Sequence, residues 1–449
     1  MNYWTLTGGL GEVVSVLPSK EQADMFVFEF TVLACLADAK DRLVANFFAC
    51  VDPVYPLLHR VAFDADYDAF WRLSPEKKSE MEPSLLALIM IILAVGTQFM
   101  YLPSGDVAAQ QERSSSAELF ASACHQALHL GAYLNRTSVQ TLQAMIFMTY
   151  FLMNVNQATA AWAFSGIMIR QAYALGLNRD PSLLMHPPAT RFQRAERRRL
   201  WQSIVTQETF LSIFLGLPPA ATHADIDSAT PLTFEGLNID ARPRSDSRHQ
   251  EQIDRSSGDY ESSFDPDNDI GYVNSMYPLA LLVQESIASP RSLSLPLART
   301  PQLRSQLLSR FRTCYRSFPE AFRAWDEQSI RKLYHRDIAG QRLVRQIMFT
   351  TTNYWHCIML IQQEGTEGLQ ESLSLGSDPM ANKKEQGGPI GCLKGTLEAA
   401  HEALRGFFVI DTMVDNEAAT WWMLCHRAFT EAVCQLPLIQ CFGNSTFQH

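Results

Sequence analysis

Two histidines four residues apart form the most metal-like pair in this sequence. His125 and His129 stand in the stretch HQALH, so a helix would place both imidazoles on one face. Zinc proteases with this spacing have a glutamate second, which deprotonates the bound water, whereas Gln126 cannot act as a base. Because no third ligand is evident nearby, we expect an ordinary polar helix face and no metal site.

Two further motifs resemble ligand sites only in part. The stretch 265–269, DPDND, looks like the first half of a calcium loop, but Ile270 and Met276 replace the required Gly and Glu. It predicts a solvated acidic linker. The glycine cluster at 8–11 follows no strand, so a frayed terminus is expected there instead of a phosphate cradle. With no G-x-S-x-G or P-loop motif either, we expect no catalytic or cofactor-binding residue and no enzyme.

An arginine-rich stretch is the strongest charge feature. It contains Arg191, Arg194, Arg197, Arg198 and Arg199, with Glu196 among them. A phosphate-binding patch is one interpretation. The other is the solvent-exposed face of a helix whose opposite face buries Leu200, Trp201, Ile204 and Leu211. Its arginines would then pair with acidic residues such as Asp225 and Asp227. We favour the second because Lys+Arg is 37, Asp+Glu is 47 and the net charge is −10.

Composition indicates a folded chain in a reducing compartment. Of 449 residues, 47% are hydrophobic, which is ample for a core. The nine cysteines form no C-x-x-C pair, and the N-terminus lacks a signal-peptide pattern. Leu85–Val95 is apolar without interruption, but a membrane span needs about 20 such residues. We therefore expect a buried core helix there, with a membrane span as the weaker alternative.

Helical periodicity dominates the chain, and no alternating run demands a sheet. We predict an all-α fold, a large multi-helix regulatory domain with loosely solenoid-like helix pairs. Helices are expected from a capping box at Ser19 towards Cys50, from a cap at Ser84, and over 116–134, 139–153, 158–175 and 190–215. In 116–134 the apolar face would contain Leu119, Phe120, Ala123, Ala127 and Leu130. Gly176 and Gly216 should end the last two helices.

Two polar stretches divide one helical body. The predicted organisation is a frayed or disordered terminus at 1–18, the main regulatory domain at 19–235, a disordered polar loop at 236–270, a helical continuation at 271–364, a flexible loop at 365–392 and C-terminal helices at 393–449. Apolar helices on both sides of each loop need each other for burial, so the loops read as insertions within one body.

Blocks of residues in a set order resemble the middle homology region of fungal zinc-cluster transcription factors. The likeness covers roughly residues 50 to 235 and includes Ser138–Ala144 and Ala174–Asp180. The residues that carry it most clearly are Tyr55, Pro56, His59, Trp162, Gly176, Arg198, Arg199, Leu200, Trp201, Gly216, Pro218, Pro219, Asp225, Asp227 and Pro231. Gln202 and Leu217 depart from the family's usual Trp and Arg.

The resemblance implies a nuclear regulator of RNA polymerase II transcription whose DNA-binding zinc module lies N-terminal to this region. The residues before Cys50 contain one cysteine, Cys35, and no histidine, so they cannot build a zinc finger. No DNA contact and no zinc ligand is therefore carried over to this chain. The expected partners are DNA through an absent or separate module and the transcription machinery or co-regulators, with no membrane. An apolar small-molecule effector and a second copy are further possible partners.

An effector could lie between helices lined by Trp162, Met168, Tyr173 and Trp201, although plain core packing explains the same residues. The alternative function is a finger-less stand-alone enzyme or small-molecule binder of a biosynthetic pathway on the same scaffold. Target genes, activation or repression, effector, oligomeric state, and the choice between a truncated gene product and a true finger-less relative stay open at this point.

Overall fold

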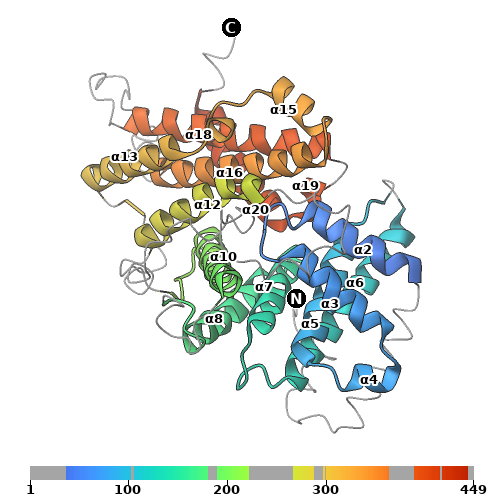
Figure 1. The fold of residues 1–449 in the computed structure, drawn as a ribbon. Helices are drawn as coiled ribbons and strands as arrows, with labels where there is room; N and C mark the ends of the chain where they lie inside the picture. The colour runs from blue at the N-terminus through green and yellow to red at the C-terminus, as the bar shows by residue number, and fades with distance from the viewer. Residues whose placement is uncertain are drawn as a thin grey trace, which may run out of the picture. The chain divides into compact units, whose positions relative to one another are not determined.

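The computed structural model describes residues 37–102, 106–179, 190–221, 266–287, 297–298, 300–363, 389–414 and 417–442. Every regular element within these ranges is a helix and none is a strand (Figure 1). The predicted all-α class is thus confirmed, while the solenoid-like pairing stays a prediction. The frayed terminus at 1–18, the Ser19 capping box and most of both predicted loops fall outside these ranges.

The described helices form two compact units, and each is considered by itself. The first comprises the described parts of Met1–Phe47 and Leu58–Phe151, and the second comprises Phe48–Leu57 and the described parts of Leu152–His449. The chain therefore enters the second unit for one short stretch, returns to the first, and leaves it again after Phe151. We call the stretch Phe48–Leu57 the anchor segment.

The first unit is built around one apolar helix. Its helices are α2 (Ala37–Cys50), α3 (Arg60–Arg72), α4 (Pro75–Ser79), α5 (Pro83–Gln98), α6 (Val107–Leu130) and α7 (Val139–Asn154), with the last residues of α2 and α7 in the second unit. All residues of α5 from Ser84 to Gln98 are buried. Such a helix needs cover on every side. Among the described helices, none combines the length and apolarity required to cross a membrane.

Two details of this unit correct the sequence predictions. Helix α5 begins at Pro83, so Ser84 lies inside it and donates from Oγ to Gln140 Oε1 at 3.3 Å instead of capping it. Helix α6 begins at Val107 after an Asp106 cap, well before residue 116. Its buried side is made of Ala117, Ala121, Ala123, Cys124, Ala127 and Leu128, whereas Leu119 is 40% exposed. Small side chains let α6 pack closely along α5.

A glycine in α5 marks a close approach to α2. A Cβ atom on Gly96 would lie 2.2 Å from the backbone oxygen of Leu43, and Asn46 Nδ2 donates to Gly96 O at 2.8 Å. Backbone atoms cannot move aside cheaply. Replacing Gly96 with alanine should therefore lower the free energy of unfolding by about 1–3 kcal/mol, measured by urea denaturation. Gly131→Ala is the matched control, because its Cβ would come no closer than 3.4 Å to any neighbouring atom, which is ordinary van der Waals contact. Equal stability of the two variants would contradict the close approach.

The second unit is arranged around the long helix α16, which packs against most of its other helices. Its helices are α8 (Ala158–Ala174), α10 (Arg191–Leu215), α12 (Pro266–Ile287), α13 (Pro301–Ser317), α14 (Glu320–Arg323), α15 (Glu327–Tyr334), α16 (Ile338–Gln363), α18 (Pro389–Met413), α19 (Glu417–Thr420) and α20 (Trp422–Phe442). Helices α16 and α18 lie side by side (Figure 1). Helices α12 and α18 begin inside the predicted loops 236–270 and 365–392, so the C-terminal end of each predicted loop lies a few residues too late.

The ends of α8 and α10 follow the predicted glycine signals. Gly176 and Gly216 have φ of 68° and 65°, the left-handed region that closes helices. The amides of Leu177 and Leu217 donate to Ala172 O and Ser212 O, both at 3.0 Å, as in a Schellman motif. At the start of α10, Thr190 and Gln193 form a reciprocal capping box.

Candidate functional site

Residues singled out by the sequence meet where α8, α10 and the loop after α10 come together. Trp162 Nε1, on α8, donates to Pro218 O at 3.2 Å. Arg197 Nη2, on α10, donates to Leu175 O at 2.6 Å, next to Gly176 at the end of α8. Leu200 and Trp201 are buried in the core of the same unit. These residues therefore hold secondary-structure ends together.

A buried glutamate fixes the loop that contains Gly216, Pro218 and Pro219. Glu208 Oε1 accepts the amide of Ala220 at 2.5 Å, and the amide of Ala221 also bonds to this carboxylate. Gln284 on α12 donates to Ala221 O and accepts from Thr209 Oγ1. Burial raises the pKa of Glu208 to about 7, although the hydrogen bonds that the amides of Ala220 and Ala221 donate to the carboxylate lower it.

The raised pKa of Glu208 predicts a pH dependence of stability. Because the folded pKa exceeds the ordinary 4.5, this group's contribution is complete below pH 4.5 and is lost as pH rises to about 7. Glu208→Gln should flatten the stability profile over this window and raise the free energy of unfolding above pH 7 by roughly 1–3 kcal/mol. The measurement is urea denaturation at several pH values. The exposed Glu398→Gln is the control, and identical profiles for both variants would refute the role of Glu208.

The arginine stretch of α10 is directed partly inward. Arg197 bonds to α8, and Arg199 lies close enough to Asp269 and Asp52 for their charges to act on it. Leu200, Trp201, Ile204 and Leu211 are buried, as the amphipathic interpretation predicts. Arg198 is half-buried. Asp225, Asp227 and Pro231 lie outside the described residues, so their predicted pairing with the arginines stays a prediction.

The anchor segment is bonded to three helices of the second unit, α12, α16 and α20. Tyr55 OH donates to Met423 Sδ at 3.1 Å, and its ring centroid lies 5.6 Å from that of Trp421. Val54 O accepts from Tyr272 OH at 2.9 Å, and Pro53 O accepts from Gln346 Nε2 at 3.1 Å. Pro56 is buried beside them. The segment is thus held by both its backbone carbonyls and its aromatic side chain.

His59 follows the anchor segment but belongs to the first unit. Its Nδ1 accepts the amide of Ala62 at 3.2 Å, which caps the start of α3. A helix cap of this kind satisfies an otherwise unpaired backbone donor. His59 therefore has a local structural role.

A buried ionic cluster joins Asp52 of the anchor segment to Asp269 on α12 and Arg342 on α16. Arg342 donates to Asp52 Oδ2 at 2.7 Å and to both oxygens of Asp269 at 2.8 Å. Gln346 Nε2 adds a bond to Asp269 Oδ1 at 2.7 Å. Burial opposes the charge of Arg342, but the two carboxylates together raise its pKa, so it stays charged. The prediction of a solvated linker is wrong for Asp269, which is 4% exposed.

Helix α16 carries more buried polar groups along its length. Arg345 and Glu417 are each 5% exposed and approach to 2.7 Å, and Trp421 Nε1 also contacts Glu417. Arg427 on α20 donates to Asn353 Oδ1 at 2.5 Å and to Thr352 Oγ1 at 2.8 Å, and His356 Nδ1 lies 2.9 Å from Glu431 Oε1. These residues were not predicted from the sequence. The feature that could have indicated them is the series of uncharged polar residues that follows Arg345 in an otherwise apolar helix.

The buried ionic cluster joins acidic and basic side chains that are far apart in the sequence. Each carboxylate of the ionic cluster faces an arginine, so none is placed as a base beside a nucleophile. Within the part of the chain that the structure describes, no group of three or more His, Cys, Asp or Glu could hold a metal ion. The rings of His125 and His129 lie 4.6 Å apart, and burial lowers the pKa of His125 to about 4.

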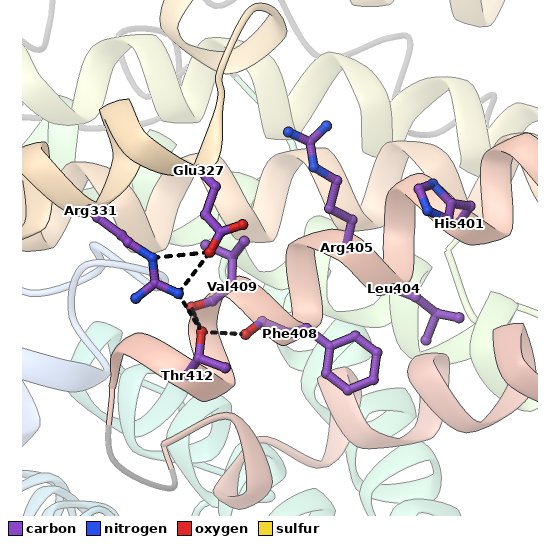
Figure 2. Close-up of a pocket in the computed structure, with 8 residues that line it drawn as sticks. All are labelled: Glu327, Arg331, His401, Leu404, Arg405, Phe408, Val409 and Thr412. Atoms are coloured by element: carbon purple, nitrogen blue, oxygen red, sulfur yellow. Dashed lines mark hydrogen bonds and ion pairs between the residues drawn. The ribbon is translucent and has the colours of Figure 1, made fainter.

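A pocket of about 380 Å³ opens between α15 and α18 (Figure 2). Its lining residues are Glu327, Arg331, His401, Leu404, Arg405, Phe408, Val409 and Thr412. None of the residues predicted to line an effector site, Trp162, Met168, Tyr173 and Trp201, belongs to it. Met168 and Trp201 are fully buried in the core, with Trp201 packed 5.5 Å from Tyr173 between ring centroids.

Comparisons with known proteins agree with the resemblance found in the sequence. The profile of the fungal specific transcription factor domain matches residues 44–337. The Zn(2)-C6 fungal-type transcription factor mpsB of Macrophomina phaseolina is 29% identical over 44% of this chain and 26% of its own length. The equisetin cluster transcription factor eqxF of Fusarium heterosporum is 28% identical over 45% of this chain and 29% of its own length. No solved structure matches. The chain thus aligns with less than a third of either relative.

Proposed function

Since this chain belongs to the fungal-specific transcription factor domain family, we propose that its helical body is the regulatory region of a transcription regulator. The family match over residues 44–337 carries this proposal, because it includes the anchor segment, α10 and the helices from α12 to α15. The buried ionic cluster is suited to such a role, since it joins residues far apart in sequence into one folded body.

The proposal assigns DNA contact and zinc to a module other than the described helices. Arg197 and Arg199 of α10 are engaged within the protein, and the chain carries a net charge of −10. Cys50, Cys124 and Cys357 lie on three different helices, and burial raises the pKa of each thiol, which disfavours metal-binding thiolates. The name of the mpsB relative supports a Zn(2)-C6 module as the DNA-binding partner.

A nuclear location and a non-enzymatic role belong to the same proposal. Around the α15–α18 pocket, Arg331 bonds to Glu327 and Arg405 approaches Glu402, so these ionisable groups already have partners. The name of the eqxF relative ties it to the equisetin cluster. We extend this to the chain as a proposal that its target genes form a biosynthetic cluster.

A reporter experiment tests the proposed function. The chain is fused to a DNA-binding module of known sequence preference and expressed in a fungal cell that carries the matching reporter gene. The fusion should change reporter transcription at least about fivefold relative to the DNA-binding module alone, in either direction. Unchanged transcription at equal nuclear protein levels would refute a regulatory role.

A further inference from the structure

Helix α13 carries arginines and no acidic residue. Between Glu285 and Glu320 the sequence contains no Asp, Glu or Lys. Four of the arginines in this stretch lie on α13, namely Arg304, Arg310, Arg312 and Arg316. The chain as a whole carries a net charge of −10, so the sign of the charge is reversed locally at this helix.

One side of α13 is buried and the opposite side is polar. Leu307 and Phe311 are buried where α13 lies beside α12 and α16 (Figure 1). The helical period places four exposed residues together on the opposite side, which are Ser305, Ser309, Arg312 and Arg316. We call these four residues the α13 arginine face.

The two arginines of this face pair with no carboxylate of the residues that the structure describes. Other exposed arginines of the same unit do have acidic partners. Arg310, on another side of α13, pairs with Glu285, and Arg331 on α15 pairs with Glu327. A guanidinium has five N–H donors and no acceptor. The α13 arginine face therefore keeps both its charge and its donors for an anionic partner.

The stability of the helix does not account for this arrangement. Arg312 and Arg316 are four residues apart, and like charges at that spacing repel each other on a helix. Arg304 lies near the N-terminal end of α13, where the helix dipole is positive and favours acidic residues. A partner that brings negative charge to α13 would offset both unfavourable terms.

Phosphate groups match this face better than the surface of a protein partner does. A guanidinium binds a phosphate through two parallel hydrogen bonds, and serine hydroxyls are further donors to phosphates. Protein partners need a buried apolar anchor, but the large apolar side chain that α13 exposes, Leu303 at 38%, lies on another side of the helix. We propose that the α13 arginine face binds the phosphate backbone of double-stranded DNA without reading its sequence.

This binding rests on the proposed function, which brings the chain to DNA through a separate module. The DNA contact assigned to that module is then its base contact, because phosphate contacts position a protein but carry no sequence information directly. At 0.1 M salt, charges are screened beyond about 10 Å. The net charge of −10 is spread over the whole chain, so it weakens the contact at α13 without abolishing it. A tethered DNA-binding module makes such a weak contact effective by raising its local concentration.

Fluorescence anisotropy of the full chain with a labelled DNA duplex of about 24 base pairs tests the proposal. We expect a dissociation constant of about 10–100 μM at 50 mM salt, equal within about twofold for two unrelated sequences. The double variant Arg312→Gln, Arg316→Gln should bind about tenfold more weakly. It should also reduce the slope of log K against log salt concentration by about 2, because two phosphate contacts are lost.

The matched control is the double variant Arg331→Gln, Arg336→Gln. It removes the same charge from two exposed arginines of the same unit, which pair with Glu327 and Asp337. Its affinity for the duplex should stay within about twofold of wild type. Thermal melts verify that both double variants are folded.

Three results would overturn the proposal: no measurable binding at 50 mM salt, equal effects of the two double variants, or a clear preference for one DNA sequence. Displacement of the duplex by poly-glutamate at equal charge would assign the face to an acidic protein and would overturn it as well. Regulation is tested separately, because in a reporter fusion the attached module supplies the DNA contact. The Arg312→Gln, Arg316→Gln fusion should therefore keep its transcriptional output.

Discussion

Replacing Arg342 with methionine should lower the free energy of unfolding by about 3–5 kcal/mol. The substitution keeps a side chain of similar length but removes the charge that faces Asp52 and Asp269. These residues are 1% and 4% exposed, so two buried carboxylates would lose their direct partner. Arg199 acts on both but is not bonded to either. The anchor segment should loosen as a result, because Asp52 lies within it.

Urea denaturation followed by circular dichroism measures this loss. Arg336→Gln is the matched control, since Arg336 is 61% exposed and pairs with the exposed Asp337. It should change stability by no more than about 1 kcal/mol. Burial already raises the pKa of Asp52, and without the opposing charge of Arg342 it should rise further, so acidic pH should restore part of the loss. A loss below about 1 kcal/mol in Arg342→Met would show that the cluster is not a buried ion pair.

The ion pair of Arg345 and Glu417 should show strong non-additivity. Arg345→Met or Glu417→Met alone should each cost about 3–5 kcal/mol, because either change leaves a charge buried without its partner. The double replacement should cost far less than the sum, since it removes both desolvation penalties at once. Both side chains are only 5% exposed, so solvent cannot screen the remaining charge in either single variant.

A double-mutant cycle on the purified chain gives the coupling directly. We expect a coupling free energy of at least about 2 kcal/mol between the two positions. The exposed pair of Arg331 and Glu327, at 41% and 55% exposure, provides a comparison cycle. Its coupling should be about 0.5 kcal/mol or less. Additive effects at Arg345 and Glu417 would contradict the buried pairing.

Helix starts, helix ends and apolar helix faces were predictable because each depends on residues within a few positions of one another. Thr190 with Gln193 starts α10, and Gly176 and Gly216 end α8 and α10 in the left-handed conformation. The apolar face with Leu200 and Trp201 was also evident, because helical spacing alone decides which side chains share a face. Such signals act within a few residues and need no knowledge of the tertiary structure.

The ionic cluster was not predictable because its members are far apart in the chain. Asp52 and Arg342 are separated by 290 residues, and Asp269 sits in a polar stretch that looks solvated. Their pairing depends on how α12 and α16 pack against the anchor segment. The predicted apolar face of α6 was correct at Ala123 and Ala127, which are buried, and wrong at Leu119, which is exposed. Close helix packing selects small side chains, and hydrophobicity alone does not reveal this.

Reporter output of three fusion proteins tests the central claim most directly, namely that the folded helical body regulates transcription. The wild-type chain, Arg336→Gln and Arg342→Met are each fused to the same DNA-binding module and compared at equal nuclear levels. Wild type and Arg336→Gln should change transcription equally, and Arg342→Met should lose most of the effect because its ionic cluster is broken. Full output from an Arg342→Met fusion whose second unit has melted would contradict the account.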